Sequence, residues 1–406
     1  MNMINVVGLG YIGLPTALMF AAHGEAVVGS DRNAKLIHTL KNDALDIGEV
    51  GIRELYHRAV PNIKFSVELV KADIYIVAVP TPYNKNSKKI NPDYVISAVE
   101  AILCICPHDS IIVIESTISP GTIDVYIRPL IDRLMRDAGK KVHLAHAPER
   151  IIPGSMVREL QNNARTIGVD NPRIGSIIRK KYAMFCNGDI VITDIKTAEM
   201  TKVVENTYRD VNIAFANELS KICRVAGIDV HEVIRIANMH PRVSILSPGP
   251  GVGGHCIAVD PWFLVGDYPR LTCLILAART VNESMPDFVM ERMAFIMREN
   301  HINDLSRVGI YGLTYKENIA DTRESPSLQL LDKMEKHMAF GVKVYDPYVA
   351  EDIVEHQYHD FAKFTSDVDF IVVMVAHDQI RETEKDLEGK ILLDCRNVLH
   401  SAGYHL

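Results

Sequence analysis

A single cysteine at the end of a glycine-rich run is the residue with the clearest chemical potential in this chain. Cys256 closes the run Gly249-Pro250-Gly251-Val252-Gly253-Gly254-His255-Cys256, and Asp260 follows four residues later. A thiolate there can add to an aldehyde to give a thiohemiacetal, which loses a hydride to become a thioester. A helix start beside the loop would favour the thiolate. The alternative is that Cys256 is a small buried side chain, as most cysteines are.

A second polar set precedes this loop. Lys202 and Asn206 are four residues apart and Arg209 follows three later, so we expect the three along one face of a helix. Two cations and an amide could hold an anionic, hydroxyl-rich ligand, or they could form an ordinary solvated face. His240-Pro241-Arg242 lies between the two sets and indicates either a phosphate neighbourhood or a structural turn.

The start of the chain carries a dinucleotide-binding pattern. In Val7-Gly8-Leu9-Gly10-Tyr11-Ile12-Gly13, Gly8 permits a tight turn, Gly10 admits a pyrophosphate, and Gly13 allows close packing of helix on strand. Asp31 follows the next strand and is placed to accept the ribose hydroxyls while repelling a 2′-phosphate. This favours NAD over NADP, although Arg32 could attract a phosphate.

Three further strand ends carry polar residues where ligands of such sheets bind. Thr81 and Thr117 each follow an apolar run and serve either as ligand contacts or as helix caps. Glu149 could position a water molecule and Arg150 could bind an anion, unless the two belong to surface ion pairs.

The elements that must position these residues follow a βαβ alternation at both ends of the chain. Apolar runs separated by helical patterns predict a doubly wound parallel sheet over residues 1–185 and a second, smaller α/β domain over 301–406. Between them, 186–300 is expected to be all-α. The predicted strands are Ile4–Val7, Ala26–Gly29, Ile74–Val79, Ile111–Ile114, Val142–Ala145, Val308–Leu313, Val342–Tyr345, Phe370–Val375 and Ile391–Leu393. The predicted helical stretches are Leu14–His23, Asp93–Leu103, Asp194–Val225, a helix from Asp229 with Glu232 in a capping box, Leu271–Glu299, and a helix from Ser325-Pro326, with a loop over Pro241–Gly254.

Composition narrows the function class. The 406 residues carry a net charge of −7 without a basic patch, which disfavours nucleic acid as a partner. The seven cysteines contain no Cys-x-x-Cys pair, so neither a zinc site nor a disulfide framework is expected, and a reducing cytoplasm is the simplest location. The first strand starts too early for a signal peptide, and no apolar run approaches the ~20 residues that would span a membrane.

At these motifs the chain resembles the nucleotide-sugar 6-dehydrogenases of the UDP-glucose/GDP-mannose dehydrogenase superfamily. The resemblance runs through essentially the whole chain in the same order. It includes Gly8–Pro15, Val79–Pro82, Glu115–Thr117, Pro148–Arg150, the Lys202/Asn206 helix, Gly253–Cys256 and Asp321–Pro326.

One departure bears on the substrate. UDP-glucose dehydrogenases usually carry Phe-Pro-Lys-Asp after the cysteine, whereas this chain has Ile257-Ala258-Val259-Asp260. The runs Asn206–Ser220, His240–Arg242 and Gly251–Phe263 are similar to the branch that oxidises UDP-N-acetyl-D-mannosamine. Enzymes for UDP-N-acetyl-D-glucosamine share the Gly-Gly-His-Cys run and are the nearest competitor, and a non-catalytic NAD-binding paralogue is the alternative of another class.

The resemblance implies a role for each matching residue. It implies that Cys256 is the nucleophile and Lys202 the base for the 6-hydroxyl, with Asn206 beside it, and that Asp260 and Glu149 are candidates for orienting the hydrolytic water. The implied NAD contacts are Gly8, Gly10, Tyr11, Ile12, Gly13, Asp31, Thr81, Thr117 and Arg323. The implied contacts of the UDP-sugar are Arg150, Ile151, Lys202, Asn206, Arg209, His240, Arg242, Gly251, Gly253 and Lys316.

These roles imply a cytoplasmic enzyme that oxidises the C6 alcohol of a UDP-N-acetylhexosamine to a carboxylate and reduces two NAD, without a metal. The product would serve surface polysaccharide synthesis. The resemblance also implies two Rossmann-like domains joined by long central helices, through which the chain would form a homodimer or a dimer of dimers.

Overall fold

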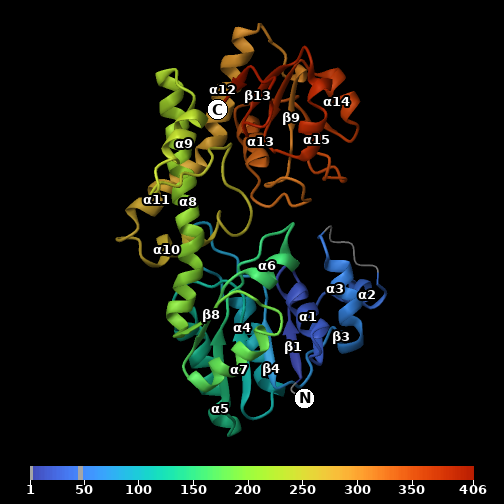
Figure 1. Ribbon diagram of the computed structural model, residues 1–406, viewed down its shortest axis with the longest axis vertical. Coiled ribbons are helices and arrows are strands. Elements are labelled where there is room, and N and C mark those ends of the chain that lie inside the picture. The colour runs from blue at the N-terminus through green and yellow to red at the C-terminus, as the bar shows by residue number, and fades with distance from the viewer. Residues whose placement is uncertain (1–2, 44–48) are drawn as a thin grey trace. The chain divides into compact units, whose positions relative to one another are not determined.

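The computed structural model describes residues 3–43 and 49–406, which form two compact units, Met1–Glu205 and Asn206–Leu406 (Figure 1). Each unit contains a sheet of mostly parallel strands that is covered by helices. In the second unit, further helices precede the sheet in the chain. The prediction of two Rossmann-like sheets with a helical central region is therefore confirmed.

The first unit is built on one sheet. Its strands are β1 (Ile4–Val7), β2 (Val27–Ser30), β3 (Ile63–Ser66), β4 (Ile74–Val77), β5 (Ser110–Ile114), β6 (Val142–His146), β7 (Arg165–Val169) and β8 (Ile190–Thr193). Their order is β3-β2-β1-β4-β5-β6-β7-β8. All neighbours are parallel except β6 and β7, which are antiparallel. The strand order reverses at β1, which is the point where sheets of this kind bind nucleotides.

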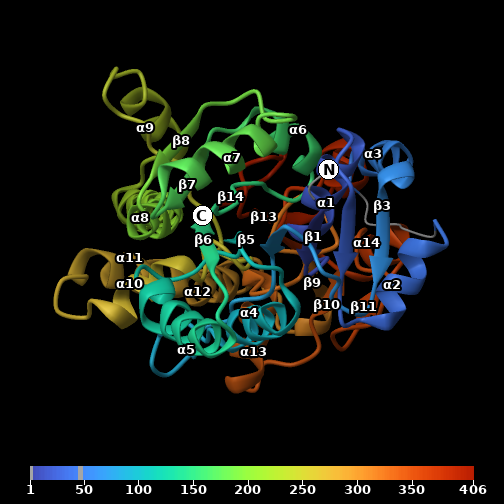
Figure 2. The same cartoon turned by 90° about the horizontal axis from the view of Figure 1, so that it is seen from below.

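Helices cover both faces of this sheet (Figure 2). One face packs against α1 (Gly13–Ala22), α2 (Ala34–Lys41), α3 (Ile52–Ala59), α6 (Met156–Asn162) and α7 (Pro172–Tyr182). The other packs against α4 (Asp93–Ile105), a π-helical turn η2 (Ile123–Ile127) and α5 (Arg128–Ala138). The strands β1, β2, β4 and β5 are buried throughout, which explains why they read as continuous apolar runs.

The long helix α8 (Ile195–Ala226) follows the first sheet. In the second unit it is succeeded by α9 (Val230–Ala237), α10 (Asp260–Asp267), α11 (Cys273–Glu283) and α12 (Met285–Glu299). The Asp229 side chain caps α9 as predicted, by accepting from the His231 N–H at 2.8 Å. Glu232, expected to complete a capping box, binds Arg235.

The helical stretch predicted over Leu271–Glu299 is divided at Ser284, which is a correction. Pro286 lies in the first turn of α12, where its missing N–H costs nothing, whereas inside one long helix it would remove a hydrogen bond. The helix start expected beside Cys256 corresponds to the short helix α10, which begins at Asp260, four residues after the cysteine.

The second sheet repeats the order of the first. Its strands are β9 (Val308–Tyr311), β10 (Lys343–Tyr345), β11 (Gln357–Tyr358), β12 (Phe370–Val373), β13 (Ile391–Asp394) and β14 (Tyr404–His405), in the order β11-β10-β9-β12-β13-β14. One face packs against α12 and α13 (Pro326–Lys336), and the other against α14 (Phe361–Asp367) and α15 (Asp378–Glu382). As predicted, Ser325 caps α13, accepting from the Ser327 N–H at 3.2 Å. No helix among the described residues is long and apolar enough to cross a bilayer.

Candidate active site

The glycines of the first motif form a turn that fits a dinucleotide. Gly8 has φ of +90°, and a side chain there would come within 2.5 Å of the Ala78 carbonyl oxygen. A side chain at Gly13 would overlap the Gly8 carbonyl. At Gly10, in contrast, nothing lies within 4 Å of the place where a Cβ would be. The turn is therefore packed on one side and open at Gly10, which is what a pyrophosphate needs.

The Asp31 carboxylate is fixed beside this turn. Its Oδ2 accepts from the Leu9 N–H and its Oδ1 from the Asn33 N–H, both at 2.8 Å. These bonds use one lone pair of each oxygen and leave acceptor capacity for ribose hydroxyls. Tyr11 is exposed and Ile12 is half-buried at the start of α1. The chain's residues thus fit the adenosine end of NAD.

Two more expected NAD contacts lie at the same edge of the sheet. Thr117 follows β5 and Thr81 follows β4, and both are half-buried. The Ser116 hydroxyl donates to the Val79 carbonyl at 2.7 Å and so joins the two strand ends. Because β1, β4 and β5 are parallel, these threonines and the glycine turn share the carboxyl edge.

A buried charge cluster lies behind this edge, and the sequence did not reveal it. Arg165 in β7 pairs with Glu149 after β6 and with Glu115 after β5, the latter at 3.2 Å. Its guanidinium also lies 4.2 Å from the centre of the Tyr182 ring, and the Tyr182 hydroxyl donates to Glu115 at 3.0 Å. Burial raises the pKa of Glu115 above its ordinary range, and Arg165 offsets part of that rise.

Glu149 and Arg150 are both held by β7 and its surroundings. The second Glu149 oxygen accepts from the Arg150 N–H at 2.7 Å, so both carboxylate oxygens have partners. The Arg150 guanidinium binds Glu205, the Ala164 carbonyl and the Thr166 hydroxyl. The next residue, Ile151, is buried. Glu149 therefore belongs to a buried network, whereas Arg150 and Glu205 form a partly exposed ion pair beside it.

Helix α8 carries the expected polar set, with one difference. Lys202 and Asn206 are 7% and 6% exposed, whereas Arg209 is exposed. Asp210 is a further buried polar residue of this face, which binds Arg279 at 2.7 Å and was not predicted. The alternative prediction of an ordinary solvated helix face is therefore wrong for Lys202 and Asn206 and correct for Arg209.

In the second unit, the cysteine loop is joined to α8. Cys256 is half-buried, forms no disulfide and lies in the turn before α10. Its carbonyl accepts from the Asp260 N–H at 2.8 Å in the turn that leads into α10, and α10 itself begins at Asp260. The Asn206 amide donates to the Asp260 carboxylate at 2.6 Å, and both side chains are buried.

The glycines of this loop allow the segment around Asp321–Pro326 to approach. Gly254 donates its N–H to the Arg323 carbonyl at 2.9 Å. A side chain at Gly253 would come within 2.6 Å of the Glu324 carbonyl oxygen and within 2.7 Å of the Tyr315 Cβ. The structure thus brings Gly251, Gly253, Tyr315 and Arg323 together, with Lys316 half-buried beside Tyr315. His240 and Arg242 are exposed, and the Arg242 N–H donates to the His240 ring at 3.3 Å.

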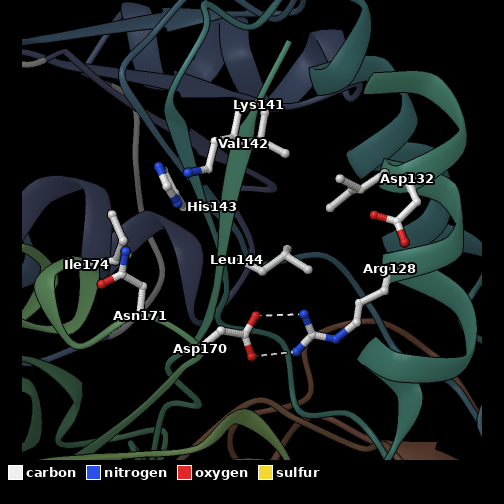
Figure 3. Close-up of a pocket in the computed structure, with 10 residues that line it drawn as sticks. Arg128, Asp132, Lys141, Val142, His143, Leu144, Asp170, Asn171 and Ile174 are labelled. Carbon is white, nitrogen blue, oxygen red and sulfur yellow. Dashed lines mark hydrogen bonds and ion pairs between the residues drawn. The ribbon is translucent and has the colours of Figure 1, made fainter. Parts of the chain in front are cut away.

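A surface pocket of the first unit lies elsewhere (Figure 3). Its volume is about 350 Å³, and its lining includes Val142, the first residue of β6, and the ion pair of Arg128 and Asp170. It therefore borders the amino end of β6, while the expected NAD contacts follow the carboxyl ends of the strands. None of the predicted site residues lines this pocket.

Comparison with known proteins agrees with this geometry. Three models of the UDP-glucose/GDP-mannose dehydrogenase family match in succession: the NAD binding domain over residues 2–186, the central domain over 196–284 and the UDP binding domain over 309–401. The chain belongs to this family. NAD is its cofactor, and the enzyme class expected from the motifs, an NAD-dependent nucleotide-sugar dehydrogenase, is confirmed.

Individual relatives are similar over nearly their full length. The UDP-N-acetyl-D-mannosamine dehydrogenase of Methanocaldococcus jannaschii is 42% identical, over 98% of this chain and 92% of that protein. The NDP-N-acetyl-D-galactosaminuronic acid dehydrogenase of Ralstonia nicotianae is 38% identical, over 97% and 96%. The solved structure of the UDP-N-acetyl-mannosamine dehydrogenase of Staphylococcus aureus has a TM-score of 0.87 at 38% identity, covering 98% of this chain and 96% of that one.

Proposed function

We propose that this chain oxidises the C6 alcohol of UDP-N-acetyl-D-mannosamine to the carboxylate, with reduction of two NAD. The observation that carries the proposal is the 42% identity, over 98% of the chain, to a relative with that name. The absence of a lysine at Val259, where UDP-glucose dehydrogenases carry one, adds to it.

In the proposed mechanism, NAD when bound accepts the hydride that leaves C6 in each of the two oxidations. Lys202 takes the proton of the 6-hydroxyl in the first. The Cys256 thiolate then adds to the aldehyde carbon, and the thiohemiacetal keeps this reactive intermediate on the enzyme. Loss of its hydroxyl proton and the second hydride gives a thioester, which water cleaves to the carboxylate and the free thiol.

The hydrolytic water has two candidate partners. Both Glu149 oxygens already accept from protein donors in a buried network. Asp260 lies four residues after the nucleophile and is oriented by the Asn206 amide. These contacts favour Asp260 as the group that orients the water, and Glu149 as a group that fixes the main chain at Arg150.

The proposed ligand contacts follow the family motifs. NAD is assigned to Gly8, Gly10, Tyr11, Ile12, Gly13, Asp31, Thr81, Thr117 and Arg323. The UDP-sugar is assigned to Arg150, Ile151, Lys202, Asn206, Arg209, His240, Arg242, Gly251, Gly253 and Lys316. The functional division proposed for the chain is 1–185 for NAD, 186–300 for the central helices and 301–406 for UDP.

The proposal extends to the oligomeric state, the cellular compartment and the use of the product. Exposed apolar side chains lie along one side of α8 at seven-residue spacing, including Tyr208 at 64%, Phe215 at 51% and Ile222 at 55% exposure. Such a row is typical of a surface that associates, which supports a dimer or a dimer of dimers through the central helices. Seven free thiols support a reducing cytoplasm, and a uronic acid product suits surface polysaccharide synthesis.

A panel of UDP-sugars tests the substrate. Two NADH per UDP-N-acetyl-D-mannosamine are expected, with little from UDP-glucose. Strong NADH formation only with UDP-N-acetyl-D-glucosamine or UDP-N-acetyl-D-galactosamine would show that this epimer, and not the mannosamine epimer, is the substrate. The name of the Ralstonia relative makes these epimers the second candidate. NAD binding without NADH formation from any UDP-sugar would indicate a non-catalytic paralogue.

The covalent step has its own test. Cys256→Ser should still bind NAD and UDP-sugar but fail to release two NADH and free acid per sugar. Cys273→Ser, at an exposed thiol on α11, is the matched control and should behave as the wild type. Full turnover by Cys256→Ser would remove the thioester from the mechanism.

A further inference from the structure

The helix that follows the Thr117 loop lacks a cap of its own. η2 begins at Ile123, and its N-cap residue Thr122 makes no side-chain bond to the helix N–H groups. The Thr122 hydroxyl donates backwards to the Ser119 carbonyl at 2.6 Å. The first N–H groups of a helix must find partners when they are buried, so another group has to supply them.

Glu199 of α8 supplies these partners from a distant part of the chain. Its Oε2 accepts from the Gly121 N–H at 2.6 Å and its Oε1 from the Ile123 N–H at 3.0 Å. Glu199 is buried, with 1% of its surface exposed. A carboxylate at this place also interacts favourably with the positive end of the helix.

The two segments that Glu199 joins both belong to the site. The Thr117–Thr122 loop lies at the NAD edge and is tied at its other end by the Ser116–Val79 hydrogen bond. Lys202 lies three residues after Glu199, on the same helix. We propose that Glu199 is a positioning residue, which holds the NAD-edge loop against the helix that carries Lys202. This inference rests on the proposed roles of Thr117 and Lys202.

The ionised form of Glu199 is the one that accepts both bonds. Burial raises the pKa of Glu199 to about 7, and the two backbone bonds offset part of the rise. The charged groups that face it are Asp124 on η2, which raises the pKa further, and Lys196 on α8, which lowers it. Below this pH one oxygen carries a proton, which makes the carboxyl a neutral and weaker acceptor with a donor of its own near the loop N–H groups, so the loop is held less firmly.

The experiment measures NAD affinity in the absence of sugar, as a function of pH. Glu199→Gln keeps the shape of the side chain but places an amide NH₂ group against one of the two backbone N–H groups, so one hydrogen bond is lost. NAD binding at pH 8 should weaken about tenfold, which is the effect of one hydrogen bond to a charged acceptor. Wild-type affinity should fall several-fold from pH 8 to pH 6, while Glu199→Gln stays flat. Glu218→Gln, at an exposed glutamate of α8, is the control and should follow the wild type.

Wild-type affinity in Glu199→Gln at pH 8, or the same pH dependence in both proteins, would overturn the inference. Should Glu199→Gln fail to fold by circular dichroism, an unchanged wild-type affinity between pH 6 and pH 8 would overturn it and a several-fold fall would support it. The readout needs no sugar, so it remains valid if the proposed substrate is wrong, and the UDP-sugar panel can fail while this test succeeds.

Discussion

Replacement of Arg165 by methionine should be among the most destabilising substitutions of a charged residue in the first unit. Arg165 is 3% exposed, and its partners Glu115 and Glu149 are 1% and 5% exposed. Methionine fills a similar volume, so the main loss is the positive charge between two buried carboxylates. Removal of one partner of a buried pair typically costs about 3–5 kcal/mol, because the remaining charge stays buried and unpaired.

The loss should grow with pH. The folded-state pKa of Glu115 is raised by burial, so protonated Glu115 stabilises the fold at low pH and this contribution is lost as pH rises through the folded-state pKa. Arg165 lowers that pKa, and its removal raises it further. Arg165→Met should therefore differ from the wild type more at pH 8 than at pH 5.

The assay is urea unfolding followed by circular dichroism at both pH values. Arg128→Met is the matched control, since Arg128 also binds a carboxylate through two nitrogens, Asp170 at 2.6 and 2.7 Å, but its side chain is 34% exposed (Figure 3). Exposed pairs contribute about 1 kcal/mol or less. Equal losses in the two variants, or a loss at Arg165 that does not change with pH, would refute the account of the buried cluster.

Two other substitutions test the ligand-binding segments. Asp31→Ala removes the acceptor beside the glycine turn, so NAD affinity should fall roughly tenfold and the preference for NAD over NADP should shrink. Titrations with both cofactors measure this, and an unchanged ratio of the two affinities would contradict the role assigned to Asp31. Gly254→Ala places a Cβ 2.8 Å from the Tyr315 ring at a residue with φ of +80°, so it should cost about 1–3 kcal/mol and abolish NADH formation. Gly403→Ala is the control for Gly254→Ala, because nothing lies within 4 Å of a Cβ at position 403. Equal unfolding midpoints in the two variants would show that the loop around Gly254 can accommodate a side chain, which would contradict the prediction.

The elements that sequence predicted well are those whose environment is uniform. β1 has the predicted bounds Ile4–Val7, and β4 and β5 differ from their predictions by one or two residues, because strands buried on both faces are continuous apolar runs. β6 also lies within one residue of its prediction, although its first two residues are only half-buried. β7 and β8 were missed for physical reasons. β7 begins with the charged Arg165, which is buried only because it is paired, and β8 is an edge strand with no fully buried residue.

The candidate site divides in the same way. The close packing at Gly8 and Gly13 could be predicted because local backbone geometry determines it. Arg165, Asp210 and Glu199 could not, because each acts on a partner 16 to 78 residues away in the chain. An arginine, an aspartate or a glutamate has no local pattern that shows which distant group it will meet.

These long-range partners have one property in common, which bears on how the site is built. Glu199 binds the backbone N–H groups of the NAD-edge loop, and Gly254 donates its own N–H to the Arg323 carbonyl. Asn206 orients Asp260, whose N–H in turn binds the Cys256 carbonyl. In each case a polar contact fixes the backbone of a loop that carries a residue proposed to react or to bind a ligand. α8 supplies two of these contacts, three residues before Lys202 and four after it. A substitution that displaces α8 without replacing Lys202 should therefore impair NAD binding and thiol chemistry together, whereas a substitution in either loop should impair only one of them.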